Sequence, residues 1–129
     1  MKILVCDDNG IERAGLVESI RRYYAESETV VEQTVCSSRE ELLEAMKKEH
    51  QEIVLVALNG VAGMEAALSA SHLQPHSLIW VSDLDFAVQS YRMGVTWFLQ
   101  KPVEENLLRQ ALARCGETQR EALRLRTSF

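Results

Sequence analysis

The feature of this sequence that most constrains its fold is a uniformly apolar run at residues 53–58, Ile-Val-Leu-Val-Ala-Leu. A strand exposed on one face alternates apolar and polar residues, whereas a parallel strand covered on both faces is apolar throughout. The shortness of the run and its branched residues favour a strand over a helix. We therefore predict a buried central strand with a layer of helices on each side.

The rest of the chain alternates predicted strands with predicted helices. The other strands are expected at residues 2–6, 30–36, 77–82 and 95–99, and the second is polar enough to be near an edge. Helices are expected after Asn9, after Ser38, over residues 64–73 beyond a 59–63 loop, from Asp83 or Asp85 to Gly94, and after Pro102, with an interruption at Gly116. Repeated strand–helix crossovers force a parallel sheet, so we predict a doubly wound α/β fold with five strands and five helices.

The starts of two helices carry capping signals. Asn9 with Glu12, and Ser38 with Glu41, have the three-residue spacing of a capping box. In the first helix we expect one side to face the core and the other to face solvent. The expected core residues are Ile11, Leu16, Val17 and Ile20, and the expected solvent-facing residues are Glu12, Arg13, Glu18 and Arg21.

The composition excludes several classes of protein. The 129 residues are 47% hydrophobic and 26% charged, as in one soluble globular domain, and the net charge of −5 offers no basic surface for nucleic acid or anionic lipid. No apolar run reaches the roughly 20 residues that span a bilayer, and no signal-peptide pattern precedes the first predicted strand. Cys6, Cys36 and Cys115 form no Cys-x-x-Cys pair, which indicates reduced thiols in a cytoplasmic protein. A redox link between Cys6 and Cys36, at the ends of neighbouring strands, is an alternative.

The candidate site lies where the parallel strands end, because ligands of such sheets bind at the carboxyl ends of the strands. The residues expected there are Asp7, Asp8, Ala57, Leu58, Asn59, Ser82 and Lys101. The aspartate pair suits Mg²⁺, or else forms the turn and caps the next helix. Lys101 is a candidate cation for phosphate or for the carboxylates, and Ser82 is either a functional hydroxyl or a helix cap.

Other kinds of site lack their motifs. No glycine-rich loop follows the first strand, and no Gly-x-Ser-x-Gly is present. His72 and His76 are separated by Pro75, which argues against one helix presenting both to a metal.

Three segments resemble the receiver domain of two-component response regulators, the CheY-like family. They are ILVCDD at residues 3–8, VAGME at 61–65 and YRMGVTWFLQKPV at 91–103, and the resemblance extends over residues 1–114. It implies a flavodoxin-like sheet with strand order 2-1-3-4-5. It also implies an acidic pair for Mg²⁺ at Asp7 and Asp8, joined by Asn59, and a phosphate pocket and switch at Ser82, Phe98, Lys101 and a cis Pro102.

The phosphoacceptor of that family has no counterpart here. Alignment on the strand places Ala57 at the acceptor position, whereas alignment on residues 63–64 places Leu58 there. The chain has four aspartates, Asp7, Asp8, Asp83 and Asp85, and none lies in this strand. Neither an alanine nor a leucine side chain is a carboxylate nucleophile, so we expect no aspartyl phosphate and a weak or lost Mg²⁺ site.

We therefore expect an atypical receiver, or pseudo-receiver, that is not an enzyme and uses no cofactor apart from weakly bound Mg²⁺. Lys101 is expected to pair with Asp7 or Asp8. Regulation would proceed by contact with a protein partner or by dimerisation through the fourth helix, fifth strand and fifth helix. Residues 1–116 would form the domain, and residues 117–129 a helical tail or the start of a linker to an output domain, as in a transcription factor.

Two alternatives remain open. In one, Asp8 or Asp7 accepts the phosphoryl group. In the other, the chain is a flavodoxin-like nucleotide-binding protein or a small phosphatase, although a phosphatase with a strand-end nucleophile needs Asp-x-Asp.

Overall fold

The computed structural model describes residues 1–127, with side-chain surroundings through residue 117. Five parallel strands form one sheet in the order β2-β1-β3-β4-β5, which confirms the predicted fold and strand order. The strands are β1 (Lys2–Cys6), β2 (Glu32–Cys36), β3 (Ile53–Val56), β4 (Ser77–Ser82) and β5 (Trp97–Gln100). The polar second strand is at an edge, as expected.

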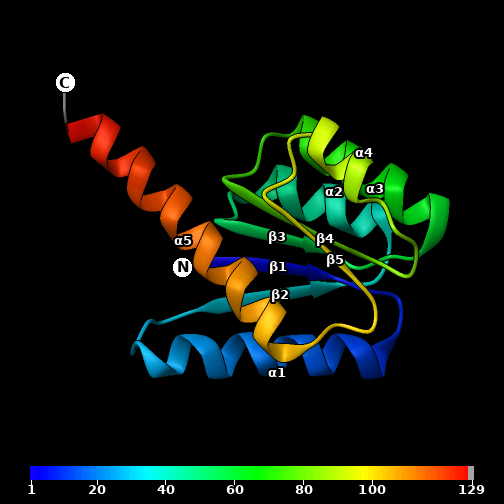
Figure 1. The fold of residues 1–129 in the computed structure, drawn as a ribbon, viewed down its shortest axis with the longest axis horizontal. Helices are drawn as coiled ribbons and strands as arrows, with labels where there is room; N and C mark the ends of the chain where they lie inside the picture. Colours follow the sequence, from blue (N-terminus) through cyan, green and yellow to red (C-terminus); the bar gives the residue numbers. More distant parts are fainter. Residues whose placement is uncertain (128–129) are drawn as a thin grey trace.

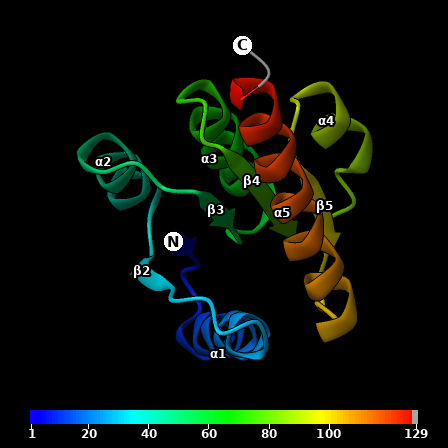
Figure 2. The same ribbon diagram turned by 90° about the vertical axis from the view of Figure 1, so that its left-hand side faces the viewer.

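Five helices alternate with the strands and cover both faces of the sheet (Figures 1 and 2). They are α1 (Gly10–Glu26), α2 (Arg39–Lys48), α3 (Gly60–His72), α4 (Ala87–Arg92) and α5 (Glu105–Thr127). The helices α1 and α5 pack on one face, and α2, α3 and α4 pack on the other. No helix within residues 1–127 combines the length and apolar character needed to cross a membrane.

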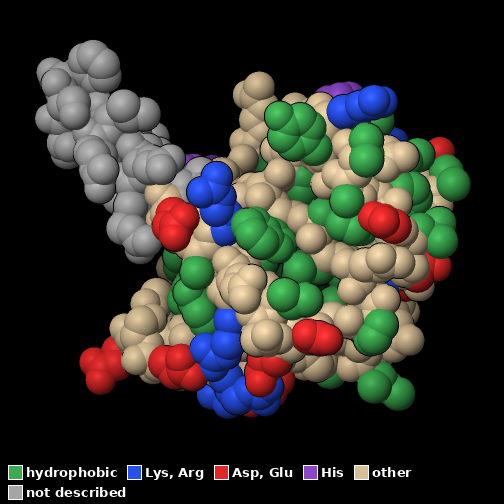
Figure 3. All heavy atoms as spheres, viewed as in Figure 1, with side chains coloured by type: hydrophobic (Ala, Val, Ile, Leu, Met, Phe, Trp, Pro, Cys, Tyr) green, Lys and Arg blue, Asp and Glu red, His purple; other side chains and the backbone are tan. Residues whose placement is uncertain are grey.

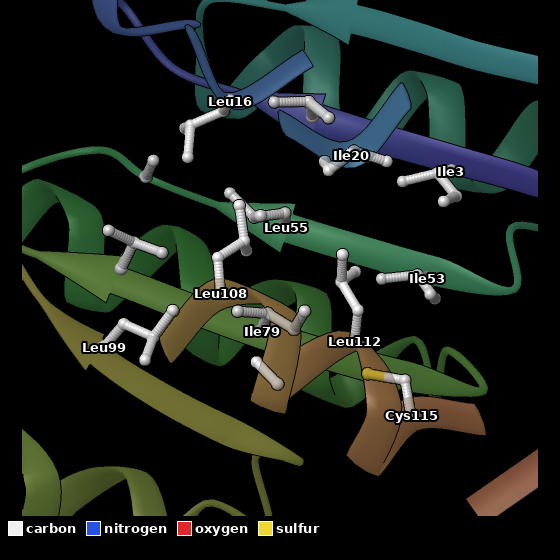
Figure 4. Close-up of a cluster of buried hydrophobic side chains, with 14 of the residues drawn as sticks. Ile3, Leu16, Ile20, Ile53, Leu55, Ile79, Leu99, Leu108, Leu112 and Cys115 are labelled. Atoms are coloured by element: carbon white, nitrogen blue, oxygen red, sulfur yellow. The ribbon is translucent and has the colours of Figure 1, made fainter. Parts of the chain in front are cut away.

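The core is divided by the sheet into two apolar clusters, because successive side chains of a strand point to opposite faces. On the α1/α5 face, Ile3, Leu55 and Ile79 from the strands meet Ile20 and Leu112 from the helices (Figure 4). On the other face, the second cluster contains Leu4, Val54, Val56, Trp80, Leu42 and the alanines Ala66, Ala67 and Ala70 of α3. Burying a side chain of this size contributes about 1.5–3 kcal/mol, so each face supports the sheet substantially.

Charged side chains gather where α1 meets α5 on the face shown in Figure 3. Arg22 pairs with Glu105, and Arg109 pairs with Glu26 in two hydrogen bonds. These pairs join two helices that are distant in the sequence. Exposed pairs of this kind contribute little stability, so the buried clusters beneath them dominate the packing.

The first helix differs from the prediction at its amino-terminal turn. Ile11 is 89% exposed, whereas Leu16 and Ile20 are buried as expected. Glu12, expected to face solvent, lies on the side of the helix that faces the sheet end. The reason is helical spacing: Glu12 is four residues before Leu16 and shares its face, whereas Ile11 is five residues before it and does not.

The third helix begins at Gly60 rather than at Met64, so the predicted loop at residues 59–63 is mostly helical. Gly63 is what allows this early start. A Cβ atom on Gly63 would lie 1.7 Å from the carbonyl oxygen of Leu58, so only glycine permits the first helical turn to sit directly on the end of β3.

The predicted interruption at Gly116 is also wrong, since α5 continues through it to Thr127. A glycine inside a helix costs only about 1 kcal/mol relative to alanine.

The fourth helix is shorter than predicted and begins at Ala87, after a turn in which Asp85 Oδ1 accepts from the Ala87 N–H. It ends at Arg92, and Gly94 follows with a positive φ of 71°. The fifth strand is correspondingly displaced toward the carboxyl end of the chain, to Trp97–Gln100.

Candidate functional site

The ends of the parallel strands bring most of the predicted site residues together. Cys6 is in register with Val56, so Asp7 and Ala57 follow at the same level on neighbouring strands. At the other side of β3, Ser82 ends β4, and its backbone carbonyl accepts from the N–H of Lys101 at 2.8 Å. These residues therefore meet at the carboxyl ends of the strands, where the site was predicted.

Lys101 is the centre of this site, and its ammonium group is fully engaged. Nζ donates to Glu12 Oε2 at 2.7 Å, to the backbone carbonyl of Ala57 at 2.7 Å and to Asn59 Oδ1 at 2.6 Å. An ammonium group has three N–H donors, so none remains for another ligand. The side chain is only 10% exposed.

The carboxylate partner of Lys101 differs from the prediction, because it is Glu12 and not Asp7 or Asp8. The first turn of α1 projects Glu12 back over the strand ends and places its carboxylate beside Nζ. Sequence reasoning missed this role because Glu12 was assigned to the outer face of its helix. Its four-residue spacing from Leu16 is the signal that identifies it.

Asp7 is completely buried. Oδ1 accepts from the backbone N–H of Asn9 at 2.9 Å, whereas Oδ2 has no hydrogen-bond partner. Burial, reinforced by the facing carboxyl of Glu12, raises the pKa of Asp7 to about 7. Burial acts the same way on Glu12, but the facing carboxyl of Asp7 and the hydrogen bond from Lys101 outweigh it and lower the pKa of Glu12. A proton on Asp7 therefore favours an ionised Glu12.

The acidic segment after β1 also has the structural role given as the alternative to metal binding: it forms a turn and caps the next helix. Asn9 caps α1, since its side chain accepts from the Glu12 N–H at 3.0 Å. The Glu12 side chain does not complete a capping box, because it binds Lys101 instead. Asp8 is exposed at the bend between these residues. Ser38, at the start of α2, accepts from the Glu41 N–H as predicted.

The two candidates for the missing acceptor point to opposite faces of the sheet. Ala57 is completely buried in the α1/α5 cluster, and its carbonyl is the one that binds Lys101. Leu58 packs in the other cluster, with Cys36 and Leu42. Ala57 is thus the residue beside the lysine, and it offers Lys101 only its backbone oxygen.

The hydroxyl of Ser82 is buried and belongs to the loop after β4. It accepts from the Leu84 N–H and donates to Asp83 Oδ1, both at 3.2 Å. The same oxygen of Asp83 accepts from the Gly60 N–H at 2.9 Å, and this backbone hydrogen bond, with Ser82, lowers the pKa of Asp83. Asp83 therefore ties the loop after β4 to the start of α3, a role that its prediction as the start of a helix did not anticipate.

The predicted switch aromatic, Phe98, is partly buried against Trp80. Their rings meet edge to face with centroids 5.3 Å apart, and Phe86 stacks on the other side of Trp80 at 4.9 Å. Trp80 is fully buried, and its indole Nε1 has no hydrogen-bond partner. The peptide bond between Lys101 and Pro102 is cis, as the resemblance implied.

Two of the oxygen atoms that a Mg²⁺ ion would need are already engaged in this arrangement. The carbonyl of Ala57 and the side-chain oxygen of Asn59 both accept from Lys101, and burial keeps the pKa of Asp7 near neutrality. Among residues 1–117, no three His, Cys, Asp or Glu side chains are grouped as metal ligands. The donor set as it stands does not fit the ion.

Comparison with known proteins identifies the fold. No protein-family model and no curated protein matches the sequence. The receiver domain of AraT, a response regulator from Geobacillus stearothermophilus, is 24% identical, with a TM-score of 0.74 over 95% of this chain and 97% of that one. A CheY-like receiver domain protein from Methanospirillum hungatei is 23% identical, with a TM-score of 0.69 over 93% and 97%.

A third similar structure is NtrX from Brucella abortus. It is 18% identical with a TM-score of 0.78, and the match covers 99% of this chain but 29% of NtrX. At these identities the likeness concerns the fold. The chain has the fold of a response regulator receiver domain.

Proposed function

We propose that this chain is an atypical receiver domain of two-component-type signal transduction that regulates by protein contact without aspartyl phosphorylation. The observation that carries the proposal is the state of Lys101. Its ammonium group is held by Glu12, Asn59 and the carbonyl of Ala57, and neither Ala57 nor Leu58 has a carboxylate that could act as the nucleophile.

The Glu12 carboxylate supplies the negative charge that a phosphoryl group brings to a conventional receiver. It lies 2.7 Å from Nζ and is 33% exposed, so the pair is partly shielded from water. Separating such a pair leaves a poorly solvated charge, which costs up to about 3–5 kcal/mol when the pair is buried. An incoming phosphoryl group would have to displace Glu12 first, and this disfavours its binding.

The remaining parts of the proposal concern metal and catalysis. With the pKa of Asp7 raised to about 7 and Asn59 engaged, Asp7, Asp8 and Asn59 form at most a weak Mg²⁺ site. Without a nucleophile at residue 57 or 58 there is no phosphoryl cycle, and we propose no enzymatic activity.

The output of such a domain is a change in its contacts. Val88 and Tyr91 on α4 are 62% and 88% exposed, and Leu107 on α5 is 38% exposed. They support the proposal that α4, β5 and α5 bind a partner or a second copy. We further propose that the domain acts in the cytoplasm and is joined to an output domain, as the greater length of NtrX suggests. Sedimentation that shows only monomer up to high concentration would argue against self-association.

Phosphorylation is tested by incubating the chain with acetyl phosphate and Mg²⁺ and recording its intact mass. A receiver domain that has its acceptor aspartate, treated in parallel, is the positive control. We expect the control to gain a phosphoryl group and this chain to remain unmodified. A hydroxylamine-labile adduct mapped to Asp7 or Asp8 would instead support the alternative in which one of them is the acceptor.

A further inference from the structure

Two of the three cysteines lie side by side on neighbouring strands. The register of β1 and β2 places Cys6 directly opposite Cys36. Registered residues of neighbouring strands project from the same face of a sheet, and both side chains belong to the buried cluster beneath α2 and α3. Each thiol acts on the other: Cys36 is the main cause that raises the pKa of Cys6, and Cys6 is the main cause that lowers the pKa of Cys36.

This arrangement suits a disulfide without movement of the backbone. Neighbouring strands lie about 4.7–4.9 Å apart. A disulfide accepts Cα separations of about 4.4–6.8 Å, provided that the two Cβ atoms point toward a common side. Cys115 is excluded from this pairing, because it lies in the cluster on the opposite face of the sheet.

Cys36 also has a route to solvent. It borders an open groove of about 370 Å³ between β2 and α2, which is lined as well by Thr34, Glu41 and Lys48. Cys36 is 5% exposed, whereas Cys6 is completely buried behind it. The groove therefore admits a small reagent to Cys36 first.

We propose that Cys36 and Cys6 form an oxidation site for a hydroperoxide and close to an intrachain disulfide. The Cys36 sulfur attacks one peroxide oxygen, the O–O bond breaks, and Cys36 becomes a sulfenic acid with release of water or an alcohol. Cys6 then attacks the Cys36 sulfur. The S–O bond breaks, the Cys6 proton leaves with the hydroxyl group as water, and the S–S bond forms. Two thiols are oxidised and one peroxide is reduced.

The site adjoins the pocket described above. The backbone carbonyl of Cys36 accepts from the Asp7 N–H at 3.0 Å, and the Cys6 thiol donates to the carbonyl of Ser38 at 3.5 Å. Disulfide formation removes the hydrogen bond from Cys6 to Ser38. It also fixes the edge strand β2 to β1 immediately before Asp7. Oxidation therefore acts on the residues that begin α1 and α2.

The test is to treat the reduced full chain with hydrogen peroxide and to block the remaining thiols under denaturing conditions. We expect a product that has lost two hydrogen atoms and carries one blocked thiol, with Cys6 and Cys36 peptides joined until a reductant is added. The same treatment in urea should lose this selectivity. The proposal is overturned if the native chain keeps three blockable thiols, or if its disulfide includes Cys115.

Variants separate the two steps. The Cys6→Ser chain should stop at a Cys36 sulfenic acid that dimedone traps, and the Cys36→Ser chain should form no intrachain disulfide. Cys115→Ser is the matched control and should oxidise like the unmodified chain. Equal dimedone labelling of Cys6 and Cys36 in the respective single variants would contradict the assigned order. Because the unmodified chain gives the primary result, a variant that fails to fold does not leave the question open.

Discussion

Replacing Asp7 by asparagine should stabilise this protein at alkaline pH, although it removes a buried charged residue from the pocket. Asparagine reproduces the protonated state of Asp7. Its Oδ1 can accept from the Asn9 N–H, which binds Asp7 Oδ1 at 2.9 Å. Its amide group can donate toward Glu12, where Asp7 Oδ2 has no partner.

The sign of the effect follows from the pKa of Asp7, which is raised from 3.8 to about 7 in the folded chain. Between these two values the folded state binds more protons than the unfolded state, so stability declines as the pH rises through this window. About three pKa units correspond to about 4 kcal/mol. Water drawn toward the carboxylate as it ionises reduces this cost, and we expect about 2 kcal/mol.

The assay is urea denaturation of both chains from pH 5 to pH 8 in the presence of EDTA. At pH 8 the D7N chain should be more stable by about 2 kcal/mol, or about 7 °C in Tm for a chain of this length. At pH 5 the two should differ much less, and the exposed control D8N should follow the unmodified chain. A D7N chain that is less stable at pH 8, or a difference that does not vary with pH, would refute the reasoning.

Two further substitutions test the pairing of Lys101 and the first turn of α3. Lys101→Met leaves the Glu12 carboxylate unpaired and should cost about 2–3 kcal/mol in urea denaturation, whereas adding E12Q should recover part of the loss; additive effects would contradict the pairing. Gly63→Ala places a methyl group against the Leu58 carbonyl and should cost more than about 3 kcal/mol, because backbone must move. Gly15→Ala, at an exposed helical site with nothing within 4 Å, is the matched control and should stabilise by about 0.5–1 kcal/mol. Equal responses of the two glycines would exclude the steric explanation.

The fold was predictable because its strongest signals are local and agree with one another. The continuous apolar run at residues 53–58, the short strands around it and the caps at Asn9 and Ser38 all indicate the same alternation. The prediction was wrong at Gly60 and Gly63, which were expected in a loop but lie in the first turn of α3. Glycines normally indicate a loop, but here Gly63 is required by a close backbone approach that only the three-dimensional structure reveals.

The location of the site was predictable from the sequence, but the partner of Lys101 was not. Strand ends of a parallel sheet meet at one edge, so Asp7, Ser82 and Lys101 were expected together. The choice of Glu12 over Asp7 as the partner of Lys101 depends on burial, which raises the pKa of Asp7, and on the direction of the first turn of α1. Both are tertiary effects, although the helical spacing of Glu12 carried part of the information.

The central claim is that the chain's own carboxylate holds Lys101, so that the pocket does not respond to a phosphoryl group. BeF₃⁻ mimics that group, and a receiver domain called DrrB has been observed in a BeF₃-activated state. We would add BeF₃⁻ and Mg²⁺ to the isotope-labelled chain and follow the backbone amide signals of Gly60, Ser82 and Lys101 by NMR. Because Glu12 already holds Lys101, we expect these signals to remain unchanged. Shifts at all three residues that saturate at one equivalent of BeF₃⁻ would contradict it.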